Sequence, residues 1–499
     1  MAIIADFGVL AGINSWKRQD DYRLAKKFLM ELAVNIPSSN LISAHSHTNS
    51  LYFRLLREWL QDCDDNHNGC KLRDNHNFWP KRVIFIGDPD KLTLCEKKPP
   101  GQDYVVLSHC WGNPTEEEKR RFCTTPENYH SRLRGFGYNS LPKTFQNAIR
   151  VTRELGKQYL WIDAICIIQG HGGDWGSEAR TMEDIFACAY CTIAASSAGG
   201  WADGFLKPSP DSQYIKMHGN AERLTCACDF DTDVDKGPLM KRAWVLQERV
   251  LSRRILHFAA THTYWECGDG VRCERFISLK PPYNKQYFVL DTNFPERLHK
   301  AGYFRAVEFV RLLFEGYSRS GLTLKSDRDT AIFSLVKRLG RVFGAEVRYG
   351  IVRCFLSTLL LWKRTHGEKT DPIGYGERTM PSWSWMAYSG GIDFISDIKL
   401  DLRVPGSTDL EFTDNGKALI VKVRQFKNCQ MKEEEGGGKH VISEATRKVG
   451  SLWFDVTDRI EFGHCIVVGM VRDSWKADYE KTYYILMVRE IPDRGVMKG

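Results

Sequence analysis

Between residues 104 and 258, compact apolar runs alternate with segments of helical periodicity, and this alternation constrains the fold more than any other feature of the chain. The apolar runs cover residues 104–108, 159–168, 191–195 and 254–258. In the segments between them, apolar residues recur every three or four positions, as at Phe145, Ile149 and Leu155. Strands separated by helical segments of this length are typical of right-handed crossovers. The pattern therefore predicts an α/β domain built on a parallel sheet, with helices on both faces.

The carboxyl ends of these strands are the places where such a sheet binds ligands. That rule selects residues 108–112, 169–174 and 196–200. In the first segment, Cys110 follows His109, which allows a nucleophile hypothesis. Adjacent residues of a strand point to opposite faces, so packing or shaping of the backbone is the favoured role for this thiol.

Asp163 is expected inside the apolar run 159–168, in the middle of a strand. A buried carboxylate is costly unless it is paired or hydrogen-bonded. Asp163 therefore belongs either to a structural network across the sheet or to a ligand-binding or catalytic group, and the residues alone leave both roles open.

Outside the α/β segment the pattern changes, and four regions are expected. These are a mostly helical region 1–100, the α/β domain 101–270, a helical region 271–380 and a mixed, strand-rich region 381–499. Helical periodicity in the first region lies at Tyr22–Val34 and Leu51–Leu60. Pro381–Trp385 ends the helical pattern of the third region and is interpreted as a packing strand, and Glu433–Lys439 is expected to be a flexible loop.

Composition excludes several classes of protein. The chain has 499 residues and a net charge of +8, and its basic residues are scattered, so no nucleic-acid-binding role is expected. No apolar stretch reaches the length of a membrane span, and no secretory leader is recognisable at the start of the sequence. Fifteen cysteines are an odd number, in a chain too long for a disulfide scaffold. We therefore expect a reduced, cytoplasmic protein.

One cluster of ligand-type residues precedes the α/β segment. Cys63, His67 and Cys70 are spaced Cys-x3-His-x2-Cys. Zinc sites usually need four ligands, and no Cys-x2-Cys pair is present here. No metal ligand is therefore included among the predicted site residues. Whether Cys63, His67 and Cys70 bind a metal stays open.

Three long segments together resemble the fungal heterokaryon incompatibility (HET) domain. They are Tyr104-Val-Val-Leu-Ser-His-Cys-Trp-Gly112, then Leu160-Trp-Ile-Asp-Ala-Ile-Cys-Ile-Ile-Gln169 with Asp174-Trp175, and Arg242-Ala-Trp-Val-Leu-Gln-Glu248. The resemblance implies a role in nonself recognition and regulated cell death. HET domains are distantly similar to TIR domains, so it also implies a TIR-like, flavodoxin-like fold. Some TIR domains cleave NAD at the nicotinamide glycosidic bond with a glutamate, and the similar position here is Glu248. The alternative is a structural glutamate paired with Arg242, Arg249 or Arg253.

The resemblance and the strand-end rule together define a candidate site. Glu248 and Asp163 are the candidate catalytic residues, and the candidate substrate-binding residues are Ser108, His109, Cys110, Trp111, Gly112, Gln169, Asp174, Trp175 and Trp244. A carboxylate near the scissile bond can stabilise an oxocarbenium-like transition state. The sequence identifies no cofactor, NAD is the candidate substrate, and a protein partner or self-association is expected. Whether the chain is an enzyme stays open, because a non-catalytic signalling module and a biosynthetic enzyme on the same scaffold are the alternatives.

Overall fold

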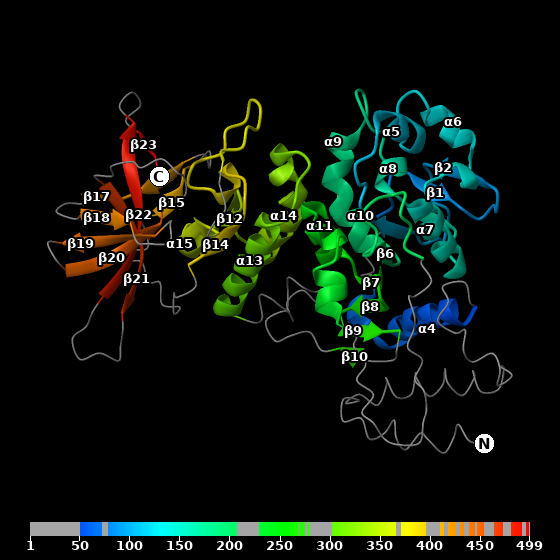
Figure 1. The fold of residues 1–499 in the computed structure, drawn as a ribbon, viewed down its shortest axis with the longest axis horizontal. Coiled ribbons are helices and arrows are strands. Elements are labelled where there is room, and N and C mark those ends of the chain that lie inside the picture. The colour runs from blue at the N-terminus through cyan, green and yellow to red at the C-terminus, as the bar shows by residue number, and fades with distance from the viewer. Residues whose placement is uncertain are drawn as a thin grey trace, which may run out of the picture. The chain divides into compact units, whose positions relative to one another are not determined.

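Two units, Met1–Phe294 and Pro295–Gly499, make up the chain (Figure 1). Each is described by itself. The expected division into four regions stays a prediction. The computed structural model describes residues 50–71, 78–206, 229–268, 270–274, 278–279, 302–365, 371–395, 410–413, 418–425, 430–433, 439–444, 447–453, 464–472, 481–491 and 496–498. The expected helix at Tyr22–Val34 and most of the expected loop at Glu433–Lys439 lie outside these residues.

A ten-stranded sheet organises the first unit, and its centre is parallel. The central strands lie in the order β5 (Tyr159–Trp161), β3 (Val105–Ser108), β6 (Thr192–Ala194) and β7 (Arg254–Phe258). In chain order this is second, first, third, fourth, which is the strand order of flavodoxin-like sheets. The α/β fold class is confirmed, whereas the resemblance to TIR domains stays a prediction.

The outer strands of this sheet are antiparallel, so the expectation of a parallel sheet is correct only for its centre. They are β1 (Val83–Phe85), β2 (Lys91–Cys95) and β4 (Phe136–Gly137) beyond β5, and β8 (Thr263–Cys267), β9 (Gly270–Cys273) and β10 (Ser278–Leu279) beyond β7. The link between β7 and β8 is residues 259–262. Such a short link joins antiparallel strands, because a parallel crossover needs a dozen residues or more.

Helices connect the four parallel strands and cover both faces of the sheet. They are α7 (Lys143–Glu154) between β3 and β5, α10 (Met182–Cys188) between β5 and β6, and α11 (Ala243–Leu251) between β6 and β7. At the end of β3, Ser108 contacts Glu248 of α11, whereas the next residue, His109, packs edge-on against Phe145 of α7. Successive side chains of a strand point to opposite faces, so α7 and α11 lie on opposite faces.

The expected strand at 159–168 is wrong beyond Trp161. The strand β5 ends there, and a short helix, α8 (Asp163–Cys166), begins at Asp163. The carboxylate of Asp163 accepts a hydrogen bond from the Ala164 backbone N–H at 2.6 Å. Aspartate side chains compete in this way with strand hydrogen bonding and favour helix starts. The helical segment expected between the apolar runs 159–168 and 191–195 is likewise divided, into α9 (Trp175–Glu178), η4 (Ala179–Thr181) and α10.

A helix that precedes the sheet in sequence packs onto it. It is α4 (Ser50–Asn66), and η2 (Asn68–Cys70) follows directly. The hydroxyl groups of Tyr52 on α4 and Thr263 on β8 lie 2.7 Å apart. The guanidinium of Arg150 on α7 lies over the ring of Phe53. Residues more than 200 positions apart in sequence thus share one buried interface.

The second unit combines helices with small antiparallel sheets. Its longer helices are α13 (Tyr303–Ser318) and α14 (Thr330–Phe343), and its four-stranded sheet has the order β17 (Val423–Gln425), β21 (His464–Arg472), β22 (Lys481–Ile491) and β23 (Val496–Lys498). Trp385 is fully buried and contacts Phe314 and Tyr317 of α13. It begins the 3-10 helix η10 (Trp385–Ala387), so the interpretation of Pro381–Trp385 as a packing strand is wrong. The described residues include no helix that could cross a bilayer.

Candidate functional site

The carboxyl ends of β3 and β6 meet where the strand order of the sheet reverses. From β3 the chain crosses to β5 on one side, and it then returns to β6 on the other side. Gly112, after β3, has a φ of 72°. A Cβ atom at Gly112 would lie 3.1 Å from the Cα atom of Gly200, which follows β6. Glycine is therefore required at residue 112, and the two strand-end loops lie in direct contact.

Glu248 lies on α11 with its carboxylate against the end of β3. The Ser108 hydroxyl donates a hydrogen bond to Glu248 Oε2 at 2.5 Å. The Glu248 residue is only 8% exposed. Burial raises the pKa of its carboxyl to about 7, the nearby Asp163 charge adds to the effect, and the Ser108 hydrogen bond and Arg242 oppose it. At neutral pH this carboxyl is thus present in both its protonated and its ionised form.

Asp163 lies at the end of the neighbouring strand, β5, and it is bonded to the loop after β3. The Trp111 indole N–H donates to Asp163 Oδ2 at 2.8 Å. The other carboxylate oxygen lies 3.8 Å from His109 Nε2, and the Asp163 side chain is 27% exposed. Asp163 therefore holds the 108–112 loop and keeps part of its carboxylate in contact with solvent. We call Ser108, His109, Trp111, Asp163 and Glu248 the strand-end cluster.

His109 is a buried, neutral member of this cluster. Its Nε2 atom makes no hydrogen bond within the described part of the chain. Burial lowers the pKa of the imidazole to about 4, although the Asp163 charge opposes the shift. The backbone carbonyl of His109 accepts a hydrogen bond from Arg242 Nη1 at 2.6 Å. Arg242 directly precedes α11 and thus joins the start of that helix to the loop after β3.

Gln169 and Asp174 lie in the loop after α8, and their contacts shape that loop. The Gln169 amide donates to the backbone carbonyls of Asp163 and Ile167, at 3.3 Å each. Asp174 Oδ2 lies 2.6 Å from Arg82 Nη2 and 2.9 Å from Lys81 Nζ. The carboxylate of Asp174 is thus already paired, which supports a structural role for it.

Trp175 and Trp244 form an aromatic pair from two separate elements, α9 and α11. Their ring centroids lie 5.8 Å apart in an edge-to-face arrangement. Trp175 is 37% exposed, which is high for so large an apolar side chain. Trp111, a member of the strand-end cluster, stacks on Trp201 with centroids 5.8 Å apart. Two aromatic pairs therefore involve candidate site residues.

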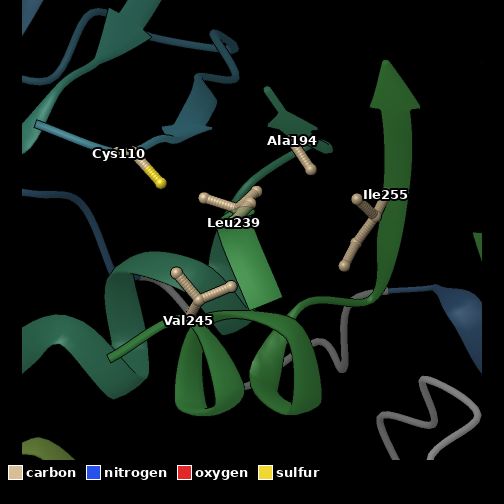
Figure 2. Packing of buried hydrophobic residues seen from close by; sticks show 5 residues of the cluster. All are labelled: Cys110, Ala194, Leu239, Val245 and Ile255. Atoms are coloured by element: carbon tan, nitrogen blue, oxygen red, sulfur yellow. The ribbon is translucent and has the colours of Figure 1, made fainter. Parts of the chain in front are cut away.

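Cys110 belongs to the hydrophobic core. Figure 2 shows its sulfur among other side chains from β6, β7, η6 (Leu239–Lys241) and α11. The members of this core cluster are Cys110, Ala194, Leu239, Val245 and Ile255. Burial raises the pKa of the Cys110 thiol, so the reactive thiolate is suppressed. This location supports the packing role over the nucleophile hypothesis.

A second buried charge network was not anticipated from the sequence. Arg249 donates from Nη2 and Nε to the two oxygens of the Glu266 carboxylate, at 2.8 and 2.9 Å. His257 Nε2 lies 2.8 Å from the same carboxylate. Arg249 also pairs with Asp235 at 2.6 Å. Although burial opposes it, the charges of Arg249 and His257 lower the pKa of Glu266 to about 2. A glutamate among apolar residues in β8 was the sequence signal for a buried charge at Glu266. The sequence did not identify its partners, because Arg249 and His257 come from other elements.

One group of metal-ligating side chains also converges in this unit, from α4, η2 and β8. It consists of Cys63, His67, Cys70 and Cys267. The structure thus adds a fourth ligand-type residue to the three that the sequence spacing identified.

A comparison with protein families matches one segment of the chain. The family model described as heterokaryon incompatibility protein (HET) covers residues 104–248. The matched segment begins just before β3, ends at Glu248 and includes the whole strand-end cluster. No curated protein matches the chain. No solved structure matches it either.

Proposed function

Residues 104–248 form a HET domain, and from this premise we propose that the chain acts in heterokaryon incompatibility by cleaving the nicotinamide glycosidic bond of NAD. The observation that carries the proposal is the buried Glu248 carboxylate, held by Ser108 at 2.5 Å at the end of a parallel strand. Carboxyl ends of such strands are where α/β sheets bind ligands. Perturbed carboxyl groups at such places are candidates for chemistry.

The reaction needs a carboxylate more than it needs an acid. The glycosidic bond between ribose C1′ and the pyridinium nitrogen breaks, and its electron pair neutralises the nitrogen of the departing nicotinamide. Positive charge then develops on the ribose ring, where an ionised Glu248 would stabilise it. Water adds its oxygen to C1′ and loses one proton, so the products are ADP-ribose, nicotinamide and a proton.

Other residues of the cluster support this chemistry. Trp111 and Trp244 offer aromatic surfaces suited to the flat nicotinamide and adenine rings. The partly exposed oxygens of Asp163 are suited to accept hydrogen bonds from ribose hydroxyl groups. His109 is neutral at pH 7 and so adds no positive charge that would oppose the ribosyl cation.

The decisive experiment measures nicotinamide release from NAD by the purified chain. Glu248→Gln keeps the shape of the side chain and removes its charge, so turnover should fall at least about 100-fold, in the range typical for loss of a charge-stabilising group. Glu154→Gln, on the exposed end of α7, is the matched control and should retain activity. Wild-type turnover should also rise with pH through about 7, because Glu248 ionises there.

Two results would refute the catalytic proposal. One is the absence of nicotinamide at high protein concentration, and the other is equal turnover in wild type and Glu248→Gln. Oligomers that form with increasing concentration, without any product, would instead favour a signalling module. In fungal cells, loss of the incompatibility reaction with Glu248→Gln but not with Glu154→Gln would link cleavage to cell death.

A further inference from the structure

Four side chains with metal-binding atoms converge at one place in the first unit. Cys63 lies in the last turn of α4, His67 directly follows that helix, and Cys70 ends η2. The fourth, Cys267, is the last residue of β8. Their ligand atoms all lie within 4.8 Å of one another.

The local backbone brings the first three ligands together. Residues four apart on a helix share one face, so Cys63 and His67 point the same way. The His67 backbone N–H donates to the Cys63 carbonyl at 3.1 Å, and the Cys70 N–H donates to the His67 carbonyl at 2.9 Å. These bonds continue the turn of the helix and bring all three side chains to Cys267, at the end of β8.

The spacing of the ligand atoms fits a tetrahedral zinc ion. With the usual zinc–sulfur and zinc–nitrogen bond lengths, two sulfurs lie about 3.8 Å apart and a sulfur lies about 3.6 Å from a nitrogen. Here Cys267 Sγ lies 3.4 Å from His67 Nδ1. Three cysteines and one histidine form an established donor set for structural zinc.

Charged side chains lie near the four ligand-type residues. His67 presents Nδ1 to Cys267 Sγ, and its Nε2 faces the Asp62 carboxylate at 4.0 Å, which is beyond hydrogen-bond distance. Asp62 is itself fixed by Arg272 Nη1 at 2.7 Å. Zinc with three thiolates carries a net charge of −1. Arg254 is the cross-strand partner of Cys267, and its guanidinium is paired with Asp64 at 2.6 Å.

We propose that Cys63, His67, Cys70 and Cys267 bind one structural zinc ion that fastens α4 and η2 to the end of β8. Four protein ligands complete the coordination sphere, which leaves no position for a substrate. Binding releases the three thiol protons and forms three zinc–sulfur bonds and one zinc–nitrogen bond. The ion links residues 200 positions apart, so it acts as a crosslink. This inference is independent of the proposed NAD cleavage.

The first test is the metal content of the full chain, purified without chelators or histidine tags. We expect about one zinc ion per chain by elemental analysis. A chromogenic zinc chelator should gain this zinc only when a mercurial reagent blocks the thiols. Cobalt in place of zinc should show the visible ligand-field bands of tetrahedral coordination and a thiolate charge-transfer band in the near ultraviolet.

Variants then assign the ligands. Cys267→Ser and His67→Ala should each lose the stoichiometric zinc, whereas Cys95→Ser, a half-buried cysteine on β2, should retain it. If the ligand variants fail to fold, the cobalt spectrum of the wild type still decides the question. Wild-type protein without stoichiometric zinc and without cobalt–thiolate bands would overturn the proposal. A disulfide between two of the three cysteines would overturn it as well.

Discussion

Replacing Glu248 by glutamine tests whether the ionised carboxyl of this residue stabilises or destabilises the folded state. Burial raises the pKa of this carboxyl from its ordinary value of 4.5 to about 7. A raised pKa means that the folded state binds the proton more tightly than the unfolded chain does. The stabilisation by protonation is therefore full below about pH 4.5, declines as the pH rises and is lost above about pH 7.

The size of the effect follows from the same values. Each tenfold difference in proton affinity is worth about 1.4 kcal/mol, so a fully ionised Glu248 costs the folded state about 3 kcal/mol. Between about pH 5 and pH 8, roughly 2.5 kcal/mol of this cost develops. Glutamine has no such dependence, and its amide oxygen can still accept the Ser108 hydrogen bond. Relative to wild type, Glu248→Gln should thus gain stability as the pH rises.

Thermal unfolding at several pH values measures this gain. For a unit of this size, 1 kcal/mol shifts Tm by about 2 °C. The Tm of Glu248→Gln minus that of wild type should therefore rise by about 5 °C between about pH 5 and pH 8. A difference that does not change with pH, or one that falls, would refute the reasoning and would show Glu248 to be an ordinary stabilising partner of a cation.

Glu266→Gln is the matched control, because this glutamate is equally buried but is paired with Arg249. Its pKa is lowered to about 2, so its contribution to stability is present above about pH 4.5 and is lost as the pH falls towards 2. The variant should lose about 3 kcal/mol at neutral pH, because it leaves a buried guanidinium poorly paired. Its deficit should stay constant between about pH 5 and pH 8, which is the opposite of the Glu248 result.

Three further predictions concern the loops around the strand-end cluster. Gly112→Ala should lower the free energy of unfolding by about 2 kcal/mol, measured in urea, because residue 112 has a positive φ and its Cβ would contact the backbone of Gly200. Asp174→Asn should cost about 3 kcal/mol in the same assay, because the fully buried Arg82 loses its charged partner. Cys110 should resist alkylation at neutral pH in the native protein and react on unfolding, as mass mapping would show; rapid native alkylation would contradict its burial.

The central part of the fold was predictable from local patterns. The runs at 104–108 and 254–258 became β3 and β7, because a strand covered on both faces reads as a continuous apolar run. The helical periodicity at Phe145, Ile149 and Leu155 corresponds to α7, which ends at Glu154 shortly before Gly156, a glycine with a φ of 73°. Both predictions rest on interactions within a dozen residues.

Predictions failed where an apolar run fits two structures. Apart from Asp163, residues 163–166 are all apolar, as in a buried strand, yet they form the helix α8. Hydrophobicity alone does not distinguish a buried strand from a buried helix. The deciding interaction is the hydrogen bond from the Ala164 N–H to the Asp163 carboxylate. Trp111 fixes the same carboxylate from another strand, and a local window of sequence does not contain that contact.

Long-range pairing also decides what the candidate site can do. The sequence placed Ser108 and Glu248 near strand ends, but not within 2.5 Å of each other across 140 residues. Burial makes Glu248 a carboxyl that ionises near neutral pH, although the Ser108 contact opposes the shift in its pKa, whereas Glu266, equally buried, stays ionised because Arg249 faces it. The two glutamates differ in their neighbours and not in their local sequence pattern. Buried carboxyls whose ionisation destabilises the fold, here by about 3 kcal/mol, concentrate at functional sites. The stability cost of Glu248 is therefore itself an argument for chemistry at this cluster.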